Sequence, residues 1–475
     1  MKNVALHPIA LLAMMVAGCA TVGNPSLPVS TVAVPQTWSN AAAPAASSQQ
    51  ALEQWWRQFN DPLLDELIAM AMTSAPDIRT AQAKLRQARA SRDLEVAGLL
   101  PSLGVSASAT RSRVGTDAGG SGNTQTLYAA GFDASWEPSI FGGQRDTAAG
   151  AVADLAASEA SLAAAQVSLA AEVALEYITL RTTQQKLAIT RDNVASQAET
   201  LQITEWRQQA GLTTVLSVEQ ARTTLEQSRS LIPGIEINRA AAGHRLAILT
   251  GQAPGALAGK LSEVKSLPVA PDSMALGIPA DTLRQRPDIR AAELKVQAEM
   301  ARSDAQRAER YPSLTLSGSW GWKAFSATAL GGSDAMVGSL LGSLAMNLFD
   351  GGRLRARIAL QDAVQEQAVI AWESSVFTAL EDVENALVDY ARSRERLDTR
   401  RRAVESARNA AQLARTLFEA GAVDFQQVLD TQRSRLTAEE SLATAEGDLL
   451  TAVVRLYKAM GGGWQAGIST QDGTS

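Results

Sequence analysis

The sequence has one cysteine and two histidines among its 475 residues, and only 5% of its residues are aromatic. Disulfide scaffolds, Cys/His zinc sites and iron–sulfur clusters each need several such ligands, so these classes are excluded. Neither sign of charge dominates, because 43 basic and 49 acidic residues leave a net charge of −6. The chain therefore lacks the basic surface that nucleic acids require, although its 46% of hydrophobic residues can form a large core.

The N-terminal residues predict export. Residues 1–18 contain a short apolar core followed by small residues, as a secretory signal does. The segment Val16-Ala17-Gly18-Cys19 resembles the bacterial lipobox, so we expect Cys19 to receive lipid and to begin the mature chain. The alternative is an ordinary cleaved signal with a coincidental cysteine. Ala20 stands where an aspartate often signals inner-membrane retention, which permits sorting to the outer membrane.

Long apolar runs are also missing after residue 19. The Ala-rich stretch 148–174 is interrupted by Asp154, Glu159, Gln166 and Glu172, so no transmembrane helix is predicted. If the protein crosses a bilayer, it must therefore do so with β-strands that close into a barrel.

The chain is instead rich in internal repetition. Five landmarks recur in order at displacements of 209 to 211 residues: Pro76-Asp77-Ile78-Arg79 at 287–290, Pro101-Ser102-Leu103 at 312–314, Gly142-Gly143 at 351–352, Ala210-Gly211 at 420–421, and Gly251 at 461. Two halves of about 210 residues are therefore expected to share one architecture.

This repetition divides the chain into six segments. We expect a signal at 1–18, a lipidated N-terminal segment and collar at 19–62, a first repeat at 63–251, a collar linker at 252–275, a second repeat at 276–461 and a tail at 462–475. The expected strands are about 101–113 and 126–139 in the first repeat, and about 312–323 and 336–349 in the second; the expected long helices are 144–210 and 353–420.

Each half is predicted to carry one β-hairpin with a polar tip. The strands alternate apolar with polar residues, and they follow helices at 77–99 and 288–310 that stop before prolines. Strands of this length can cross a bilayer, but four cannot close a transmembrane barrel, so several chains must contribute. The alternative is that both hairpins pack on a soluble core.

Each hairpin is followed by an unusually long helix. The segment 353–420 contains neither proline nor glycine and carries an apolar stripe of period seven: Val369, Val376, Val383, Tyr390, Leu397, Val404, Ala411 and Phe418. Such a stripe predicts a coiled coil. We expect return helices at 213–250 and 424–460, the first kinked or broken at Pro233, and water on two sides of each helical hairpin.

Several short motifs, taken in order, resemble the TolC-type outer-membrane efflux proteins, and in particular the lipoproteins that serve RND pumps. They are Trp55-Trp56-Arg57-Gln58-Phe59-Asn60-Asp61-Pro62, Arg286-Pro287-Asp288-Ile289-Arg290-Ala291-Ala292-Glu293, Tyr311-Pro312-Ser313-Leu314, Phe349-Asp350-Gly351-Gly352-Arg353 and Leu456-Tyr457-Lys458-Ala459-Met460-Gly461-Gly462-Gly463-Trp464. Each motif is weak alone, but the ordered set spans nearly the whole mature chain.

The resemblance implies a mainly α fold with a membrane β-barrel. It implies a homotrimer with a 12-stranded barrel in the outer membrane, a 12-helix tunnel through the periplasm and an equatorial collar. It also implies two partners, a periplasmic adaptor and an inner-membrane RND transporter, which make the protein a passive exit duct for drugs or other small molecules. We expect Trp55, Trp56 and Phe59 to pack in the collar and not to bind a ligand.

The same resemblance points to a gate at the periplasmic end. Asp430 and Arg433 match the family's gate motif and share a helix face, where charged groups from three chains could line a constriction. The alternative is a solvated ion pair within one helix. The further gate candidates are Asp424, Glu219 and Arg222, and the expected adaptor-docking tips are Gly211, Leu212, Thr213, Gly421, Ala422 and Val423.

Other functions fit the sequence less well. For an enzyme, the sequence offers two weak candidates. His244 is expected to be a surface or packing residue, and the segment Gly255–Lys260 resembles a phosphate-binding loop but is one residue too short. No metal or cofactor is expected. A periplasmic coiled-coil scaffold would explain the heptads but not the hairpins, and a channel for type I protein secretion remains open.

Overall fold

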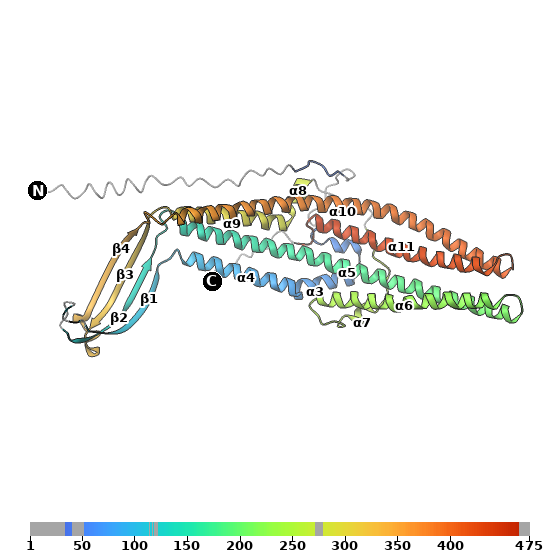
Figure 1. Ribbon diagram of the computed structural model, residues 1–475, viewed down its shortest axis with the longest axis horizontal. Coiled ribbons are helices and arrows are strands. Elements are labelled where there is room, and N and C mark those ends of the chain that lie inside the picture. The colour runs from blue at the N-terminus through green and yellow to red at the C-terminus, as the bar shows by residue number, and fades with distance from the viewer. Residues whose placement is uncertain are drawn as a thin grey trace.

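The structure is a computed structural model that describes residues 34–39, 52–113, 115, 117, 122–270 and 279–464. The helical body is elongated, with the sheet at one end and two helical turns at the other (Figure 1). The predicted signal and Cys19 lie outside the described residues.

The elements follow the predicted order in both halves. The first half contains the 3₁₀-helix η1 (Trp55–Phe59), α3 (Pro62–Ser74), α4 (Pro76–Ala97), β1 (Ser102–Arg113), β2 (Thr124–Trp136), α5 (Gly143–Gln209) and α6 (Val215–Leu249). The second contains α7 (Ala258–Leu261), α8 (Pro279–Gln285), α9 (Pro287–Ala308), β3 (Ser313–Ala324), two short 3₁₀-helices (Ala327–Ala329 and Ser333–Ala335), β4 (Met336–Ala345), α10 (Arg353–Glu419) and α11 (Phe425–Ala459).

Matching lengths confirm that the architecture is duplicated. The helices α5 and α10 have 67 residues each, α6 and α11 have 35, and α4 and α9 have 22. Because α5 begins at Gly143 and α10 at Arg353, the residue that precedes each helix is Gly142 or Gly352. The predicted match of Gly142 with Gly351 was therefore wrong by one residue.

The return helix α6 is continuous through Pro233, so the predicted break there was wrong. A proline removes one intrahelical hydrogen bond, but the residues on both sides of Pro233 stay helical. The packing of α6 along α5 stabilises the helix despite the missing hydrogen bond.

The four strands form one antiparallel sheet in the order β1-β2-β3-β4. The last register pair between β3 and β4 joins Ser313 to Ala345. Pro312, which comes next, has no N–H to donate, so β4 ends at Ala345 and not at the predicted residue 349. Similarly, β2 ends at Trp136, before Pro138, and not at the predicted residue 139.

The helices pack as two antiparallel hairpins. On the tip side, α6 lies along α5 and α11 lies along α10, while α11 also contacts α5 and so joins the two hairpins. On the sheet side, α9 lies between α5 and α10, and α4 contacts α5. We call the pair α5/α6 the first hairpin and the pair α10/α11 the second hairpin.

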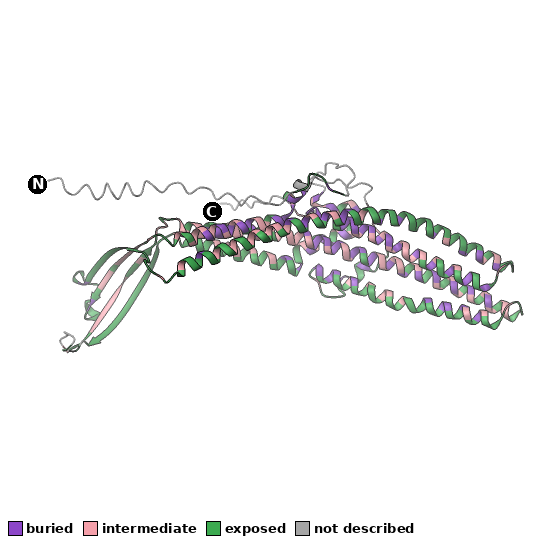
Figure 2. Cartoon of the chain, turned by 45° about the horizontal axis from the view of Figure 1, so that its top comes forward, coloured by how far each residue is buried: buried purple, intermediate pink, exposed green. Residues whose placement is uncertain are grey.

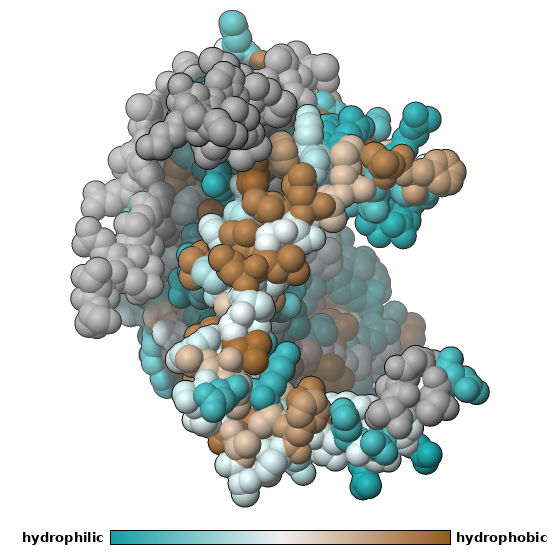
Figure 3. Space-filling model, turned by 90° about the vertical axis from the view of Figure 1, so that its left-hand side faces the viewer, coloured by the Kyte–Doolittle hydropathy of each residue, from teal (hydrophilic) through white to brown (hydrophobic). Residues whose placement is uncertain are grey.

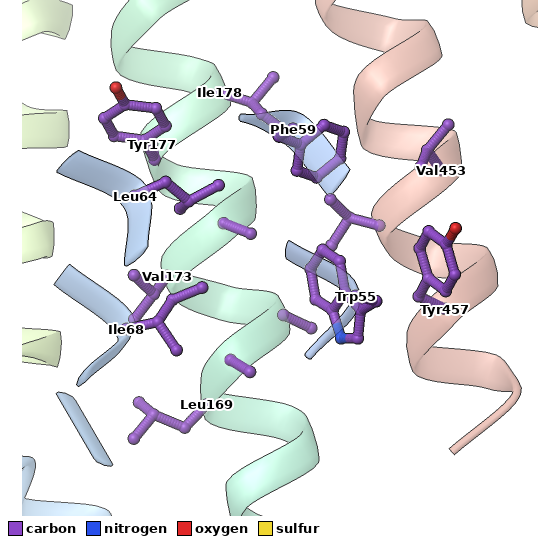
Figure 4. Close-up of a cluster of buried hydrophobic side chains, with 14 of the residues drawn as sticks. Trp55, Phe59, Leu64, Ile68, Leu169, Val173, Tyr177, Ile178, Val453 and Tyr457 are labelled. Carbon is purple, nitrogen blue, oxygen red and sulfur yellow. The ribbon is translucent and has the colours of Figure 1, made fainter. Parts of the chain in front are cut away.

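The main hydrophobic core lies near the middle of the molecule, where η1 and α3 meet α5 and α11 (Figure 4). Trp55 is completely buried and stacks on Tyr457, with ring centroids 5.4 Å apart. Phe59 packs edge-on against Trp55, and Trp56 is half-buried against the same core. These contacts show that the three aromatic residues pack in the hydrophobic core, whereas their place in an equatorial collar stays a prediction.

The predicted heptad stripe of α10 faces inward for most of its length. Val376, Val383, Leu397, Val404, Ala411 and Phe418 are buried, while Val369 and Tyr390 are half-buried. Much of the helical surface toward the tips remains exposed (Figure 2). The stripe of α5 differs, because its buried positions near the tip are polar, as described below.

Candidate functional site

The sheet has one apolar and one polar face. Register pairs on one face join Val105 to Phe132, Phe132 to Trp320 and Leu314 to Leu344. Large apolar side chains on this face are exposed, with Leu340 87% and Val105 77% accessible. Figure 3, which views the molecule from the sheet end, shows apolar side chains at this surface. Such a face requires a covering of lipid or protein.

The opposite face carries short polar side chains. Ser106 of β1 donates a hydrogen bond to Asp133 of β2 at 2.6 Å, and the hydroxyls of Ser319 on β3 and Ser339 on β4 lie 2.8 Å apart. Transmembrane β-barrels have this arrangement, with apolar residues toward lipid and polar residues toward the lumen. In addition, β1 and β4 are the edges of the sheet, and within the described part of the chain no strand pairs with their outer sides.

Among the residues that the structure describes, one helix also reaches the length and apolarity of a membrane span. This helix is α5, in which an 18-residue window has a mean hydropathy of 1.2. Half of that window is buried inside the protein, and the core helix of a soluble protein has the same composition. The hydropathy of α5 is therefore explained by its place in the main hydrophobic core.

The far ends of both helical hairpins turn in the same way. The N–H of Leu212 donates to the carbonyl of Arg207 at 2.8 Å, and the N–H of Ala422 donates to the carbonyl of Leu417 at the same distance. Gly211 and Gly421 hold φ angles of +76° and +73°, the left-handed conformation that glycine adopts without strain. Both glycines, Leu212 and Ala422 are exposed, and Thr213 and Val423 are half-exposed.

Each turn leads into a capped helix. The side chain of Thr214 accepts a hydrogen bond from the N–H of Ser217 at 3.3 Å, and Asp424 accepts one from the N–H of Gln427 at 3.0 Å. The contact made by Asp424 is therefore the N-cap of α11. Sequence reasoning missed the exposed apolar residues Val215 and Leu216, which extend the tip surface of the first hairpin.

The predicted gate pair is not an ion pair within this chain. The Asp430 carboxylate accepts a hydrogen bond from Gln426 at 3.0 Å, whereas Arg433 donates to the Thr224 hydroxyl on the other hairpin at 3.0 Å. Both side chains are exposed. In contrast, Glu219 and Arg222 do form an intrahelical ion pair at 2.8 Å, and Arg222 also reaches Glu205 on α5 at 3.2 Å.

A small apolar cluster joins the two tips. Phe418 and Phe425 lie with ring centroids 5.3 Å apart, beside Val428 and Leu429. Arg207 of the first hairpin lies over the Phe418 ring, 4.5 Å from its centroid, and donates to the Phe418 carbonyl at 3.0 Å. This contact fixes the end of one hairpin against the end of the other.

Above that cluster, the seam between the hairpins is polar, and sequence reasoning missed it. The buried polar residues are Thr190, Asn193, Gln197, Thr200 and Thr204 on α5, and Gln432 and Glu439 on α11. Their spacing of three and four residues could have revealed them, but polar residues at such positions resemble an exposed helix face. Hydrogen bonds cross this part of the seam, from Asn193 to Glu439 and from Gln432 to Thr200.

Glu439 is the charged centre of this seam. Its side chain is 5% exposed, and its Oε1 accepts hydrogen bonds from the Nε atoms of Arg408 at 2.7 Å and Arg435 at 3.1 Å. Its Oε2 accepts a hydrogen bond from the amide of Asn193 at 3.3 Å. Burial raises the pKa of Glu439, but the hydrogen bonds from the two arginines outweigh it and hold the pKa below its ordinary value.

The residues considered for catalysis have other surroundings. His244 lies exposed on α6. Lys260, in the segment that resembles a phosphate loop, pairs with Glu66. Within the described ranges, no group of three or more His, Cys, Asp or Glu side chains could hold a metal ion.

The molecule has a membrane-type sheet at one end, a body with helices of about 100 Å, and two exposed turns at the other end. These features define the class of channel proteins that extend from a membrane as a helical tube. The family model for outer membrane efflux proteins matches residues 67–252 and 278–462. The chain belongs to this family, which consists of outer-membrane efflux channels and not of enzymes.

Individual relatives agree with this assignment. The pyoverdine export outer membrane protein OpmQ of Pseudomonas putida is 33% identical over 491 residues, with 99% of each chain covered. The outer membrane protein OprJ of Pseudomonas aeruginosa is 29% identical, covering 97% of this chain and 96% of OprJ. Among solved structures, the outer-membrane channel OprN superposes with a TM-score of 0.88 and 34% identity, covering 93% of this chain and 99% of OprN.

Proposed function

We propose that three copies of this chain form the outer-membrane exit duct of a tripartite efflux pump. The two-faced sheet with two free edges, at the end of a long helical body, carries this proposal. Three such sheets would supply the 12 strands of a closed barrel, and the helical hairpins would supply a 12-helix periplasmic tunnel. The duct conducts drugs or other small molecules passively, and an inner-membrane RND transporter supplies the energy.

The remaining attachments follow from this assembly. Lipid on Cys19 anchors the N-terminus to the periplasmic side of the outer membrane. A relative named as a probable outer membrane lipoprotein, SilC of Salmonella typhimurium, is 28% identical over 95% of this chain. The exposed tips around Gly211 and Gly421 face away from the sheet, where a periplasmic adaptor would meet them.

The duplication also predicts the strand register between copies. The β1/β2 hairpin ends at the pair Ser102–Ser135, and the β3/β4 hairpin ends at the equivalent pair Ser313–Ala345. Therefore β1 corresponds to β3, and β2 corresponds to β4. The pairing of β2 with β3 therefore has its counterpart in β4 of one copy with β1 of the next. Under this correspondence, the pair Phe132–Trp320 becomes Gly342 paired with Ala109 of the neighbouring copy.

A cysteine pair tests the closed barrel. Cysteines at Ala109 and Gly342, in a chain whose Cys19 is lipidated, are expected to form disulfides between copies and to give covalent trimers on a denaturing gel. Within one chain these positions are three strand spacings apart across the sheet, about 14 Å, and eight residues apart along it, which is too far for a disulfide. The control pair Ala109→Cys with Gly338→Cys lies four residues out of register and should remain monomeric. Cross-linking by the control but not by the test pair would refute the register.

The gate candidates divide into two groups. Asp430 and Arg433 are exposed on α11, and no cation within the described chain pairs with Asp430, so they can line the constriction where three chains meet. Glu219 and Arg222 are already paired with each other, and Asp424 caps a helix, so these three have a smaller part in the gate.

Shortening Asp430 tests the gate. Asp430→Ala is expected to raise the single-channel conductance of the closed trimer in a planar bilayer severalfold, because a shorter side chain widens a constriction that three copies share. Asp448→Ala is a matched control on the same helix, where the half-exposed carboxylate pairs with Arg396 at 2.9 Å. Equal conductance of Asp430→Ala and the wild type would remove Asp430 from the gate.

A further inference from the structure

The seam between the two hairpins differs from the seam within the second hairpin. Between α10 and α11, apolar residues such as Leu397, Leu449, Phe418 and Phe425 are buried. Between α5 and α11, Thr200 accepts a hydrogen bond from the Gln432 amide at 3.0 Å. Both amide heteroatoms of Gln197 are buried and have no hydrogen-bond partner among the described residues. An apolar seam resists opening because it would expose hydrophobic area, whereas water can replace the hydrogen bonds of a polar seam.

The Glu439 cluster, defined as Glu439 with Arg408, Arg435 and Asn193, is the part of this polar seam that water replaces least readily. Glu439 is buried, and its two oxygens together contact α5, α10 and α11. Separating the hairpins would remove the Asn193 amide, one of three donors to a carboxylate that is buried in the seam. The cluster lies 14 residues along α11 from Phe425, or about 20 Å from the tip.

The duplication shows that this cluster is particular to the seam between the halves. The positions 210 residues away from Glu439, Arg435, Arg408 and Asn193 hold Arg229, Leu225, Ala198 and Ala403. A carboxylate with two guanidinium partners therefore has no counterpart in the other half. A purely structural feature of the helical repeat would be expected to recur there.

We propose that the Glu439 cluster is a clamp that holds the second hairpin against α5 and thereby positions the gate residues of α11 in the closed channel. Glu439 is a positioning residue: it acts through the helix that carries Asp430 and Arg433, and it does not itself line the constriction. This inference rests on the proposed channel function.

The test is the conductance of purified full-length trimers in planar bilayers. Glu439→Gln keeps the size of the side chain and removes its charge, so we expect the closed-state conductance to rise severalfold while heat-resistant trimers persist. The matched control is Glu440→Gln, since Glu440 also contacts α5 but bonds to the neutral hydroxyl of Thr190 at 3.2 Å. An equal rise in both variants, or no rise in Glu439→Gln, would overturn the clamp.

A charge reversal separates the clamp from simple packing. The triple variant Arg408→Glu, Arg435→Glu and Glu439→Arg restores opposite charges at the same positions, and the Asn193 amide can accept where it donated. We expect its conductance to return to the wild-type level. A triple variant as leaky as Glu439→Gln would assign the effect to packing and contradict the proposal.

Two further comparisons keep the result interpretable. If Glu439→Gln does not assemble, Arg408→Gln replaces a side chain that is 59% exposed and should raise conductance in the same direction. Unchanged conductance in that variant would then contradict the clamp. If wild-type trimers carry no current at all, the channel function itself fails, which is distinct from a conducting wild type that Glu439→Gln leaves unchanged.

Discussion

Gly421→Trp is expected to abolish the drug resistance that the proposed exit duct would confer together with a pump and an adaptor, while assembled trimers stay in the outer membrane. Gly421 lies at the exposed turn of the second hairpin, and a Cβ added there would meet no atom within 4 Å. The chain itself therefore has room for the indole, which would project into the space of a docked adaptor. The left-handed φ of +73° adds only about 1–2 kcal/mol of strain for a non-glycine residue.

The measurement is the minimal inhibitory concentration of a pumped drug in a host that lacks its own channel of this family. Gly421→Asn is the control, because asparagine tolerates the left-handed conformation and is small. We expect this control to keep most of the resistance. Gly211→Trp should repeat the loss, since its φ of +76° and open surroundings are the same. Full resistance in both tryptophan variants would show that the turns do not receive the adaptor.

Gly321→Val is expected to prevent the barrel from forming. Gly321 faces Gly131 across β2 and β3, and a Cβ at Gly321 would lie 2.3 Å from the carbonyl oxygen of Ala130. Backbone atoms cannot move away as a flexible side chain can, so the two central strands would have to separate. Heat-resistant trimers in outer-membrane fractions should therefore disappear.

Gly318→Val, on the same strand, is the matched control for this loss. A Cβ there would meet its nearest atom, the Leu340 Cδ1, at 3.8 Å, which is an ordinary contact. We expect Gly318→Val to assemble normally and even to gain strand propensity. If Gly321→Val also gave normal amounts of trimer, the close approach of β2 and β3 would not be required for the barrel.

Much of this architecture was predictable because the chain repeats itself. Period-seven spacing located α10, prolines and glycines marked its neighbours, and alternation located all four strands to within a few residues. The errors occurred where a local rule met a tertiary contact. Pro233 did not break α6, because packing against α5 supports the helix on both sides. The strand β4 stopped at Ala345 because its partner strand β3 begins directly after Pro312.

The site was less predictable than the fold, for a physical reason. The spacing of Asp430 and Arg433 places both on one helix face, but it cannot reveal that Arg433 bonds to Thr224 on another helix 209 residues away. Glu439 was missed because Thr, Gln and Glu at heptad positions look like a solvated surface. Only the meeting of three helices shows that this carboxylate is buried.

The position of the collar core has a consequence for biogenesis. The hydrophobic core around Trp55 is made by residues of one chain alone, so it does not depend on contacts with other copies. The sheet has no such support, since one apolar face and two edges remain uncovered in a single chain, and uncovered strand edges promote aggregation. The newly exported polypeptide should therefore need a periplasmic chaperone on its strands until bilayer insertion and subunit association occur together.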